Sequence, residues 1–355
     1  MVLIPEGHRF RSFDKGVRLH PKMETPPKDI LDVLDRMHLL NGAAPTGEPL
    51  TGGVSSDIWR IDLPDGAICI KRALPKLRVN ADWQAPVERN LYEARWMRVA
   101  SQAVPHASPT LLGQDEATGT LAMEYLPPER YPLWKALLRD GVVDVAFASR
   151  VAGTLGRIHA ATAANPSLAT DFPTDAIFYD IRLEPYLIHT GRAHPDLADR
   201  MRVLIETTQR NRHALVHGDV SPKNILCGPD GPVFLDAECA WWGDPAFDLA
   251  FCLNHLMLKC LWVPSARAAL LESFDAMTAT YLPLVNWEPA RSLEYRAAHL
   301  LPALFLARVD GKSPVEYITQ EADRDKVRTV ARRLLADSPE RLGDVVRAWK
   351  EEIAA

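Results

Sequence analysis

The sequence lacks the features of several common classes of protein. It contains no GxxxxGK(S/T) loop, which excludes a Walker-type nucleotide site. Its most apolar later segments, residues 249–261 and 300–307, are too short or too interrupted to span a bilayer. The residues at its amino terminus lack the apolar core of a signal peptide. We therefore expect no membrane partner and no secretory targeting.

Excess basic charge and paired cysteines are also absent. The chain has 41 basic against 46 acidic residues, a net charge of −5, and no polybasic run, which argues against a nucleic-acid partner. Its five cysteines are odd in number, include no CxxC pair and have no metal-ligand spacing. They are typical of small core residues in a reduced protein, so we expect a cytoplasmic location.

What the sequence does contain is an ordinary globular composition over a long chain. Of its 355 residues, 47% are apolar and 25% are charged. This length is sufficient for two or more lobes, each with its own core. The oligomeric state stays open between a monomer and a homodimer.

The stretch 217–236, HGDVSPKNILCGPDGPVFLD, predicts a loop followed by a tight hairpin. Its two short apolar strands flank the segment 228–232, which is dense in turn-forming residues. A five-residue turn centred on the middle of that segment would place Asn224 opposite Asp236, about 5 Å away. An amide oxygen and a carboxylate, with Asp219 nearby, are donors that suit Mg²⁺ beside substrate phosphates. The stretch therefore indicates phosphoryl transfer.

The order of these residues resembles a known group of enzymes. HGDxxxxN followed by Asp236-Ala237-Glu238 is similar to the aminoglycoside phosphotransferase and choline kinase superfamily, in which HGD replaces the HRD of protein kinases. The resemblance implies an α+β, two-lobed, protein-kinase-like fold. A small antiparallel-sheet lobe would comprise residues 1–126, and a larger, mainly helical lobe residues 127–355. It also implies ATP and Mg²⁺ as cofactors.

The same resemblance assigns roles around the hairpin. Asp219 would orient the acceptor hydroxyl and take its proton, as the catalytic aspartate of kinases does. Asn224 and Asp236 complete the catalytic set and would hold Mg²⁺. Glu238 would assist a second metal ion, directly or through water. These four residues form the expected catalytic and metal set.

Three further residues are expected to act on the catalytic loop. Asp248, at the start of a predicted helix, would brace the loop through backbone hydrogen bonds, and His217 would fix its geometry. Lys223 has two readings that the sequence leaves open. It either touches the γ-phosphate or faces solvent.

Lys71 ends an apolar strand that follows the strong turn 64–66. In kinases such a lysine holds the α- and β-phosphates of ATP and needs an acidic partner on a following helix. The predicted helix 87–99 offers Glu88 and Glu93, and its apolar periodicity does not choose between them. The resemblance favours Glu93.

Two other segments are expected to contact ATP. The Gly/Ser-rich turn 50–57 includes Gly53 and Ser55, whose backbone would approach the phosphates, although the turn also fits an ordinary hairpin. A strand ending at two prolines would form the hinge between lobes. There the backbone of Glu124 and Leu126 would hydrogen-bond the adenine.

A closer branch of the superfamily is suggested by other segments. Residues 71–79, 238–248 and 307–311 are similar to 5-methylthioribose kinase, although the asparagine in the catalytic loop is the usual superfamily residue, at a point where methylthioribose kinases typically diverge. The last segment contains Arg308, and an earlier aromatic and charged segment contains Arg182, which either lines the substrate cleft or belongs to a packed connector. Both arginines suit a neutral or anionic acceptor such as a sugar.

The hypothesis from the sequence is an ATP- and Mg²⁺-dependent phosphotransferase acting on a hydroxyl of a small molecule, such as a methylthioribose-like pentose. One alternative is an aminoglycoside or other antibiotic phosphotransferase. Another is a nucleotide-binding regulatory protein without transfer activity. ATP and GTP are not distinguished.

Overall fold

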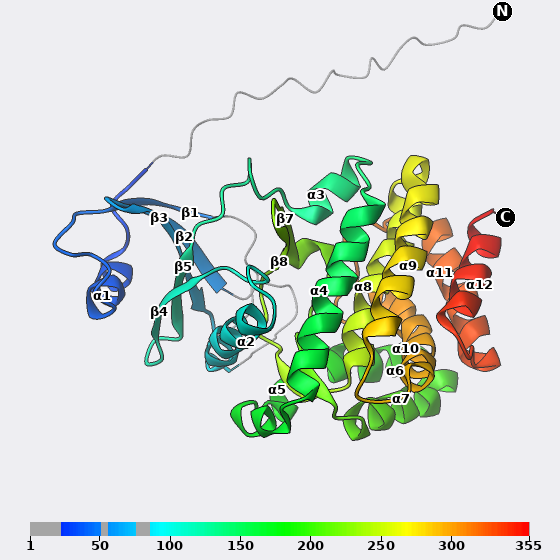
Figure 1. The fold of residues 1–355 in the computed structure, drawn as a ribbon. Helices are drawn as coiled ribbons and strands as arrows, with labels where there is room; N and C mark the ends of the chain where they lie inside the picture. The colour runs from blue at the N-terminus through cyan, green and yellow to red at the C-terminus, as the bar shows by residue number, and fades with distance from the viewer. Residues whose placement is uncertain (1–22, 51–55, 76–85, 355) are drawn as a thin grey trace, which may run out of the picture.

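The computed structural model describes residues 23–50, 56–75 and 86–354 (Figure 1). A small sheet with two helices lies at one end, and a larger body of helices makes up the rest. This is the predicted α+β fold, with a small antiparallel sheet and a mainly helical lobe. The assignment of 1–126 and 127–355 as the two lobes stays a prediction.

The sheet has five strands, each antiparallel to its neighbours. In spatial order they are β1 (Thr46–Pro49), β2 (Ser56–Leu63), β3 (Gly66–Ala73), β5 (Thr120–Glu124) and β4 (Leu111–Asp115). Side chains alternate between the two faces of a strand. In β3, Ile68 and Ile70 therefore pack with Ile30 and Leu34 of α1 (Lys28–Arg36), on one face of the sheet. Lys71 projects from the opposite face.

Helix α2 (Arg89–Ala103) covers that opposite face and lies between the sheet and α4 (Figure 1). Its buried residues Ala94, Trp96 and Met97 belong to the same hydrophobic core as the helical lobe. The helix thus connects the sheet to the rest of the molecule. This position carries Glu93 toward Lys71.

The helical lobe is built around α8, which is buried along almost its whole length between α9 and α10. The α-helices are α3 (Trp134–Arg139), α4 (Val145–Ala163), α5 (Asp175–Phe178), α6 (His189–Ala193), α7 (Ala198–Arg210), α8 (Pro245–Trp262), α9 (Arg267–Tyr281), α10 (Ala290–Asp310), α11 (Glu321–Asp337) and α12 (Leu342–Ala354). The short 3-10 helices are η1 (Pro166–Asp171), η3 (Pro195–Leu197), η4 (Pro222–Asn224), η5 (Pro264–Ala266) and η6 (Leu282–Leu284). A π-helix, η2 (Tyr179–Ile188), contains an internal proline.

Two short strand pairs lie beside this lobe. β6 (Ala214–Val216) pairs with β9 (Trp241–Gly243), and β7 (Ile225–Gly228) pairs with β8 (Gly231–Phe234). They hold the two ends of the loop that precedes the hairpin.

The predicted register of the hairpin was wrong by one residue. Gly228 pairs with Gly231, so the turn contains only Pro229 and Asp230. Two glycines close the turn directly, and Gly231 has a φ of 138°, which glycine adopts without strain. Asn224 therefore lies opposite Leu235, whose N–H donates to the Asn224 carbonyl at 2.8 Å, and not opposite Asp236.

Within the described ranges, no single helix is both long and apolar enough to cross a membrane. One helix pair, Pro245–Trp262 with Pro264–Leu284, passes that test only when taken together, and it is bent by 119°.

Candidate active site

The loop between β6 and β7 is held by one buried carboxylate. Asp248, in the first turn of α8, accepts hydrogen bonds from the backbone N–H of His217 at 2.7 Å and of Gly218 at 2.8 Å. Its Oδ2 also lies 3.2 Å from Nε2 of His159, which is fully buried. The expectation that Asp248 braces this loop through backbone hydrogen bonds is confirmed.

The histidine of the HGD motif is a buried structural link. The Asp219 N–H donates to Nδ1 of His217 at 3.1 Å, so that nitrogen is an acceptor, and Nε2 faces the Leu235 carbonyl at 3.1 Å. Burial lowers the pKa of His217, which agrees with a neutral ring protonated on Nε2. The ring therefore ties the loop to the hairpin.

Glycine is required at position 218, between His217 and Asp219. Its φ is 81°, and a Cβ there would lie 2.7 Å from the carbonyl oxygen of Cys239. A side chain would therefore strain the backbone and collide with a neighbouring segment. The loop can follow this path only with glycine at 218.

Asp219 is buried and is held by two cations. Its Oδ2 lies 2.9 Å from Nη2 of Arg182 and 3.1 Å from Nζ of Lys223. Burial acts to raise the pKa of Asp219, but these two charges outweigh it and hold the pKa below the ordinary value. Asp219 is thus an ionised carboxylate in a site largely closed to water.

Arg182, predicted to contact substrate, is saturated by the protein itself. Besides Asp219, its guanidinium donates to the carbonyls of Gly218 and, at 2.6 Å, Ile181. Lys223 lies on Asp219 with its side chain 46% exposed, so it faces the site from a partly open position. Neither residue had been predicted as a partner of Asp219.

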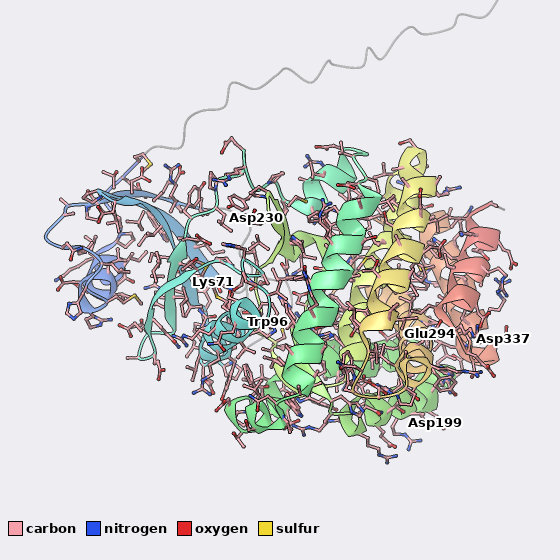
Figure 2. The ribbon with its side chains drawn as sticks, in the orientation of Figure 1. Lys71, Trp96, Asp199, Asp230, Glu294 and Asp337 are labelled. Carbon is pink, nitrogen blue, oxygen red and sulfur yellow. The ribbon has the colours of Figure 1, made fainter. Side chains whose placement is uncertain are left out.

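Lys71 joins the sheet to the hairpin, and Figure 2 shows it on the side of the sheet that faces the helical lobe. Its Nζ lies 2.8 and 2.7 Å from the two oxygens of Glu93 and 2.5 Å from Oδ1 of Asp236. Glu88 is exposed, so the structure pairs Lys71 with the glutamate that the resemblance favoured. Burial acts to raise the pKa of Asp236, but Lys71 and Lys223 hold it well below its usual range.

Asp236 itself has a φ of 67°, in the left-handed region. A non-glycine residue there turns the chain sharply out of the strand direction. The residue thus leaves the ladder directly after β8, which ends at Phe234, and its carboxylate meets Lys71 in spite of the shifted hairpin register.

Glu238, predicted as a further metal ligand, has another partner. Its Oε2 lies 2.8 Å from Nε of Arg89, which is fully buried at the start of α2 and also donates to the carbonyls of Leu74 and Pro86. The predicted set did not include Arg89. In the sequence it stands at the start of the predicted helix 87–99, next to Glu88, and nothing there marks it as a partner of Glu238.

The oxygens present fit a divalent cation. Nδ2 of Asn224 donates to the Asp219 carbonyl at 3.1 Å, and no described residue donates to its Oδ1, which leaves that oxygen available. Asp236 adds an ionised carboxylate. Among the described residues, no three His, Cys, Asp or Glu side chains form a metal cluster. This small set matches Mg²⁺, which takes one or two carboxylates and completes its shell with phosphates and water.

The remaining predicted nucleotide contacts fall in two groups. Gly53 and Ser55 lie outside the described residues. Glu124 ends β5, where its N–H donates to the Thr110 carbonyl and its Oε1 accepts from the Thr110 N–H, both at 2.9 Å. Leu126 follows β5, and no described residue contacts its backbone N–H or carbonyl.

Arg308, near the end of α10, is buried and donates from Nη1 to the hydroxyl of Tyr186 at 3.0 Å. The guanidinium carbon of Arg308 lies 5.6 Å from the centre of the Tyr186 ring, and that of Arg182 lies 5.9 Å from it. The two predicted substrate arginines therefore meet around one tyrosine of η2.

Comparison with known proteins agrees with this fold. Residues 46–293 match the model of the phosphotransferase enzyme family (APH), and the chain belongs to this family. It is 26% identical over 244 residues to a methylthioribose kinase of Geobacillus thermodenitrificans, covering 60% of each chain. It is 23% identical over 229 residues to a methylthioribose kinase of Bacillus cereus, covering 58% of each chain. The matched part thus spans about three-fifths of these relatives.

A solved structure shares the fold over most of the chain. The amicoumacin kinase hAmiN, in complex with AMP-PNP, Ca²⁺ and Ami, has a TM-score of 0.54. The match covers 89% of this chain and 98% of that one at 12% identity. At this identity the likeness concerns the fold alone.

Proposed function

We propose that this protein transfers the γ-phosphoryl group of ATP to a hydroxyl of a small molecule. The observation that carries the proposal is the meeting of an ionised, buried Asp219 with Asn224, Asp236 and the Lys71–Glu93 pair in one site. Mg·ATP supplies an activated phosphoryl group when it is bound. The resemblance, the family and the AMP-PNP of the structural neighbour all support this donor.

Asp219 would act on the acceptor. It would accept the hydrogen bond of the acceptor hydroxyl and take its proton as the new O–P bond forms and the bond from the γ-phosphorus to ADP breaks. Because Arg182 and Lys223 lower its pKa, Asp219 is a weak base. Its main contribution is then to orient the hydroxyl, with the proton accepted late.

The other residues would bind the nucleotide. Asn224 and Asp236 would hold Mg²⁺, and Lys71, oriented by Glu93, would neutralise the α- and β-phosphates. Oε2 of Glu238 is engaged by Arg89, so a metal ion would be held by its other oxygen or would compete with this ion pair. At the hinge, Leu126 has its backbone groups available for adenine, whereas the Glu124 N–H is already used by Thr110.

The acceptor class is supported by the relatives and by charge. A methylthioribose-like pentose is the first candidate, since the curated relatives are methylthioribose kinases. Arg182 and Arg308 around Tyr186 disfavour a polycation such as an aminoglycoside. A cytoplasmic location accords with the five cysteines, all of which are free.

Calorimetry and an acceptor screen test the proposal. We expect wild type to bind ATP more tightly with Mg²⁺ than without it, and Asp236→Ala to lose that difference. We also expect ADP release from Mg·ATP with at least one of a set of small hydroxylated metabolites. Wild type that does not bind Mg·ATP, or an Asp236→Ala variant that binds it equally well, would overturn the assignment.

A further inference from the structure

One face of α8 carries a line of buried residues that leads away from the catalytic loop. Asp248, Phe251, His255 and Lys259 are three or four residues apart, a spacing that places them on one side of a helix. At 1.5 Å per residue the line extends roughly 16 Å from the loop brace to the lysine. The guanidinium carbon of Arg182 lies 5.8 Å from the Phe251 ring, so the line begins beside the catalytic carboxylate.

Lys259 is a buried amine without a counter-ion among the described residues. It is 1% exposed, and its Nζ lies 4.3 Å from the ring centre of Tyr317 and 5.0 Å from that of Trp262. Those two rings stack on one another at 4.5 Å. Burial lowers the pKa of Lys259 to about 7. An aromatic cage of this kind holds a cation but does not neutralise it.

Arg308 is a second buried cation that no described carboxylate contacts. It is 7% exposed, and its hydrogen-bond partners among the described residues are the Tyr186 hydroxyl and the carbonyl and hydroxyl of Ser313. The nearby acids are engaged elsewhere, Glu316 with Lys135 and Asp219 with Arg182. A buried charge without a counter-ion destabilises the folded protein. Its presence therefore indicates a role other than stability.

The charge of Arg308 acts on His255, Lys259 and Tyr317, which places these side chains near one another. Three of their polar atoms are buried without a partner among the described residues. They are Nε of Arg308, Nε2 of His255 and the hydroxyl oxygen of Tyr317. Buried polar groups in folded proteins nearly always have a hydrogen-bond partner, so three orphans together indicate a missing one. We name His255, Lys259, Arg308 and Tyr317 the basic cluster.

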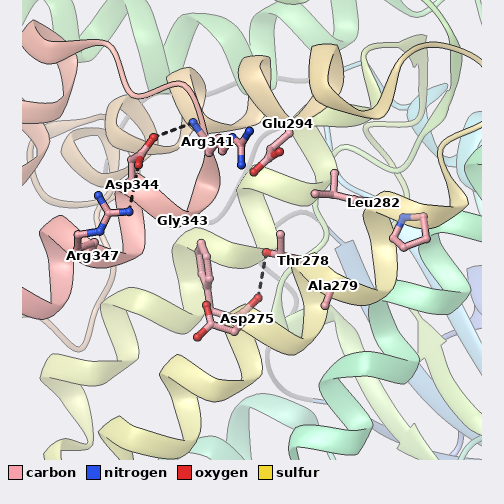
Figure 3. A pocket seen from close by; sticks show the side chains of 11 residues that line it. Asp275, Thr278, Ala279, Leu282, Glu294, Arg341, Gly343, Asp344 and Arg347 are labelled. Atoms are coloured by element: carbon pink, nitrogen blue, oxygen red, sulfur yellow. Dashed lines mark hydrogen bonds and ion pairs between the residues drawn. The ribbon is translucent and has the colours of Figure 1, made fainter.

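A surface cavity elsewhere in the molecule has no such buried, unpartnered polar atoms in its lining. It has a volume of about 500 Å³ and lies between α9, α10 and the start of α12 (Figure 3). Four of its five charged side chains have partners within the protein: Asp344 pairs with Arg347, Asp275 with Lys350, and Glu294 accepts from a backbone N–H. None of its lining residues has a buried unpartnered polar atom.

We propose that the basic cluster binds an anionic group, a carboxylate or a phosphate, on the acceptor whose hydroxyl is presented to Asp219. The inference rests on the proposed function and takes a hydroxylated acid as the acceptor, in place of the uncharged methylthioribose-like pentose named there first. An anion would supply the acceptors that Arg308, His255 and Tyr317 lack and the negative charge that Lys259 lacks. Tyr186, shared by Arg182 and Arg308, makes the cluster continuous with the catalytic carboxylate.

The test compares acceptors that differ mainly in charge. One set is glucuronate, glucose and glucosamine, and the other is ribose 5-phosphate and the uncharged methylthioribose. ADP release with Mg·ATP gives kcat/KM for each, and thermal stability with each compound gives binding. We expect the acid in a set to be preferred by roughly 10-fold or more, as a charge-assisted contact provides. Equal values within both sets, including no response to any member, overturn the inference.

Variants separate binding from a merely structural role. Arg308→Gln and Lys259→Met should lower kcat/KM for the acid roughly 10-fold while changing that for the neutral member little, and Arg308→Lys should keep part of the preference. Arg347→Gln, on the exposed end of the distant cavity, is the matched control and should leave the preference unchanged. Equal loss for every acceptor would mark the two residues as structural and refute the inference.

The Mg·ATP calorimetry described above distinguishes the two levels of proposal. If wild type binds Mg·ATP with dependence on Asp236 but prefers no acid, only the acceptor class is wrong. If it does not bind Mg·ATP, the transferase assignment and the acceptor class both fall.

Discussion

The catalytic cleft and the basic cluster are both buried and both charged, but they differ in how the charge is neutralised. In the cleft Lys71 contacts Glu93 and Asp236, and Arg182 contacts Asp219. In the basic cluster Lys259 and Arg308 have only aromatic rings, hydroxyls and a carbonyl among the described residues. The first region supplies its own counter-ions, whereas no described residue supplies one to the second.

This difference predicts opposite responses to mutation. Breaking a buried ion pair leaves a charge without compensation and destabilises a protein by about 3–5 kcal/mol. Removing a cation that is already uncompensated relieves the protein of a desolvated charge. Substitutions in the cleft should therefore destabilise or inactivate, and a neutral replacement in the cluster should stabilise the free protein.

The largest effect is expected at Asp219. Asp219→Ala should lower kcat by roughly 10²–10⁴-fold, because the acceptor hydroxyl loses the group that orients it and accepts its proton, while Mg·ATP affinity stays close to wild type. ADP release and calorimetry measure the two quantities. Asp230→Ala is the control, because Asp230 is exposed in the turn of the same hairpin (Figure 2). Unchanged turnover in Asp219→Ala would remove this residue from the chemistry.

The next largest effect is expected for Lys71→Met, on the stability of the protein. It leaves Glu93 and Asp236 buried without their shared cation, so we expect the free energy of unfolding to fall by about 3–5 kcal/mol at pH 7 in urea titrations. Burial already raises the pKa of Glu93, and losing Lys71 raises it further. The deficit should therefore shrink as pH falls and Glu93 becomes protonated.

The double variant Lys71→Met with Glu93→Gln provides the check on this explanation. It removes one of the two stranded carboxylates, so it should recover part of the lost stability at pH 7. A double variant that is less stable than Lys71→Met alone would contradict it.

Arg182→Gln should shift the pH dependence of turnover. Arg182 and Lys223 hold the pKa of Asp219 below its ordinary value, so kcat should remain high into the acid range and fall only as Asp219 is protonated. Without Arg182, only Lys223 opposes the effect of burial, so the pKa of Asp219 rises. The acid limb of the kcat profile should move to higher pH by a similar amount. An unmoved limb would show that Asp219 does not govern it.

Much of the cleft could be predicted because its residues sit in a short ordered motif. The HGD spacing and the later acid predicted that Asp219, Asn224 and Asp236 converge, and the kinase pattern predicted the Lys71–Glu93 pair. Phosphoryl transfer from a nucleotide requires residues of these types in this order, so the pattern can be recognised in the sequence without the structure. The roles assigned to the residues stay predictions.

The geometry that joins these residues could not be predicted in the same way. The hairpin register depends on which residues of a glycine- and proline-rich turn close it, and several choices suit that composition. The left-handed backbone of Asp236 is imposed by its surroundings, not by its residue type. Arg182 lies in a π-helix that contains Pro185, and the apolar periodicity of the sequence does not predict this rare conformation.

The basic cluster was even less visible in the sequence. Lys259 stood out only as an interruption of an apolar segment, and Tyr317 comes 58 residues later in a loop after α10. Only tertiary packing shows that this lysine lies under an aromatic ring near a second unpaired cation.

The last prediction tests the unpaired state of Lys259 directly. Its folded pKa is about 7 against an ordinary value of 10.5, so between these values the unfolded chain binds more protons than the folded one. Wild-type stability should therefore gain up to roughly 1.4 kcal/mol per pH unit from this group as pH rises from 7 to 10. Lys259→Met should be more stable than wild type at pH 7, and the difference should vanish above pH 10.5.

Urea titrations across that range measure the slope. Lys350→Met is the control, because Lys350 is partly exposed and pairs with Asp275, and it should leave the slope unchanged. A Lys259→Met variant that is less stable than wild type at pH 7, with an unchanged slope, would show that the lysine already has its counter-ion within the protein. In that case the contrast between a self-neutralised cleft and an unneutralised cluster, and the case for an acidic acceptor that depends on it, would both fail.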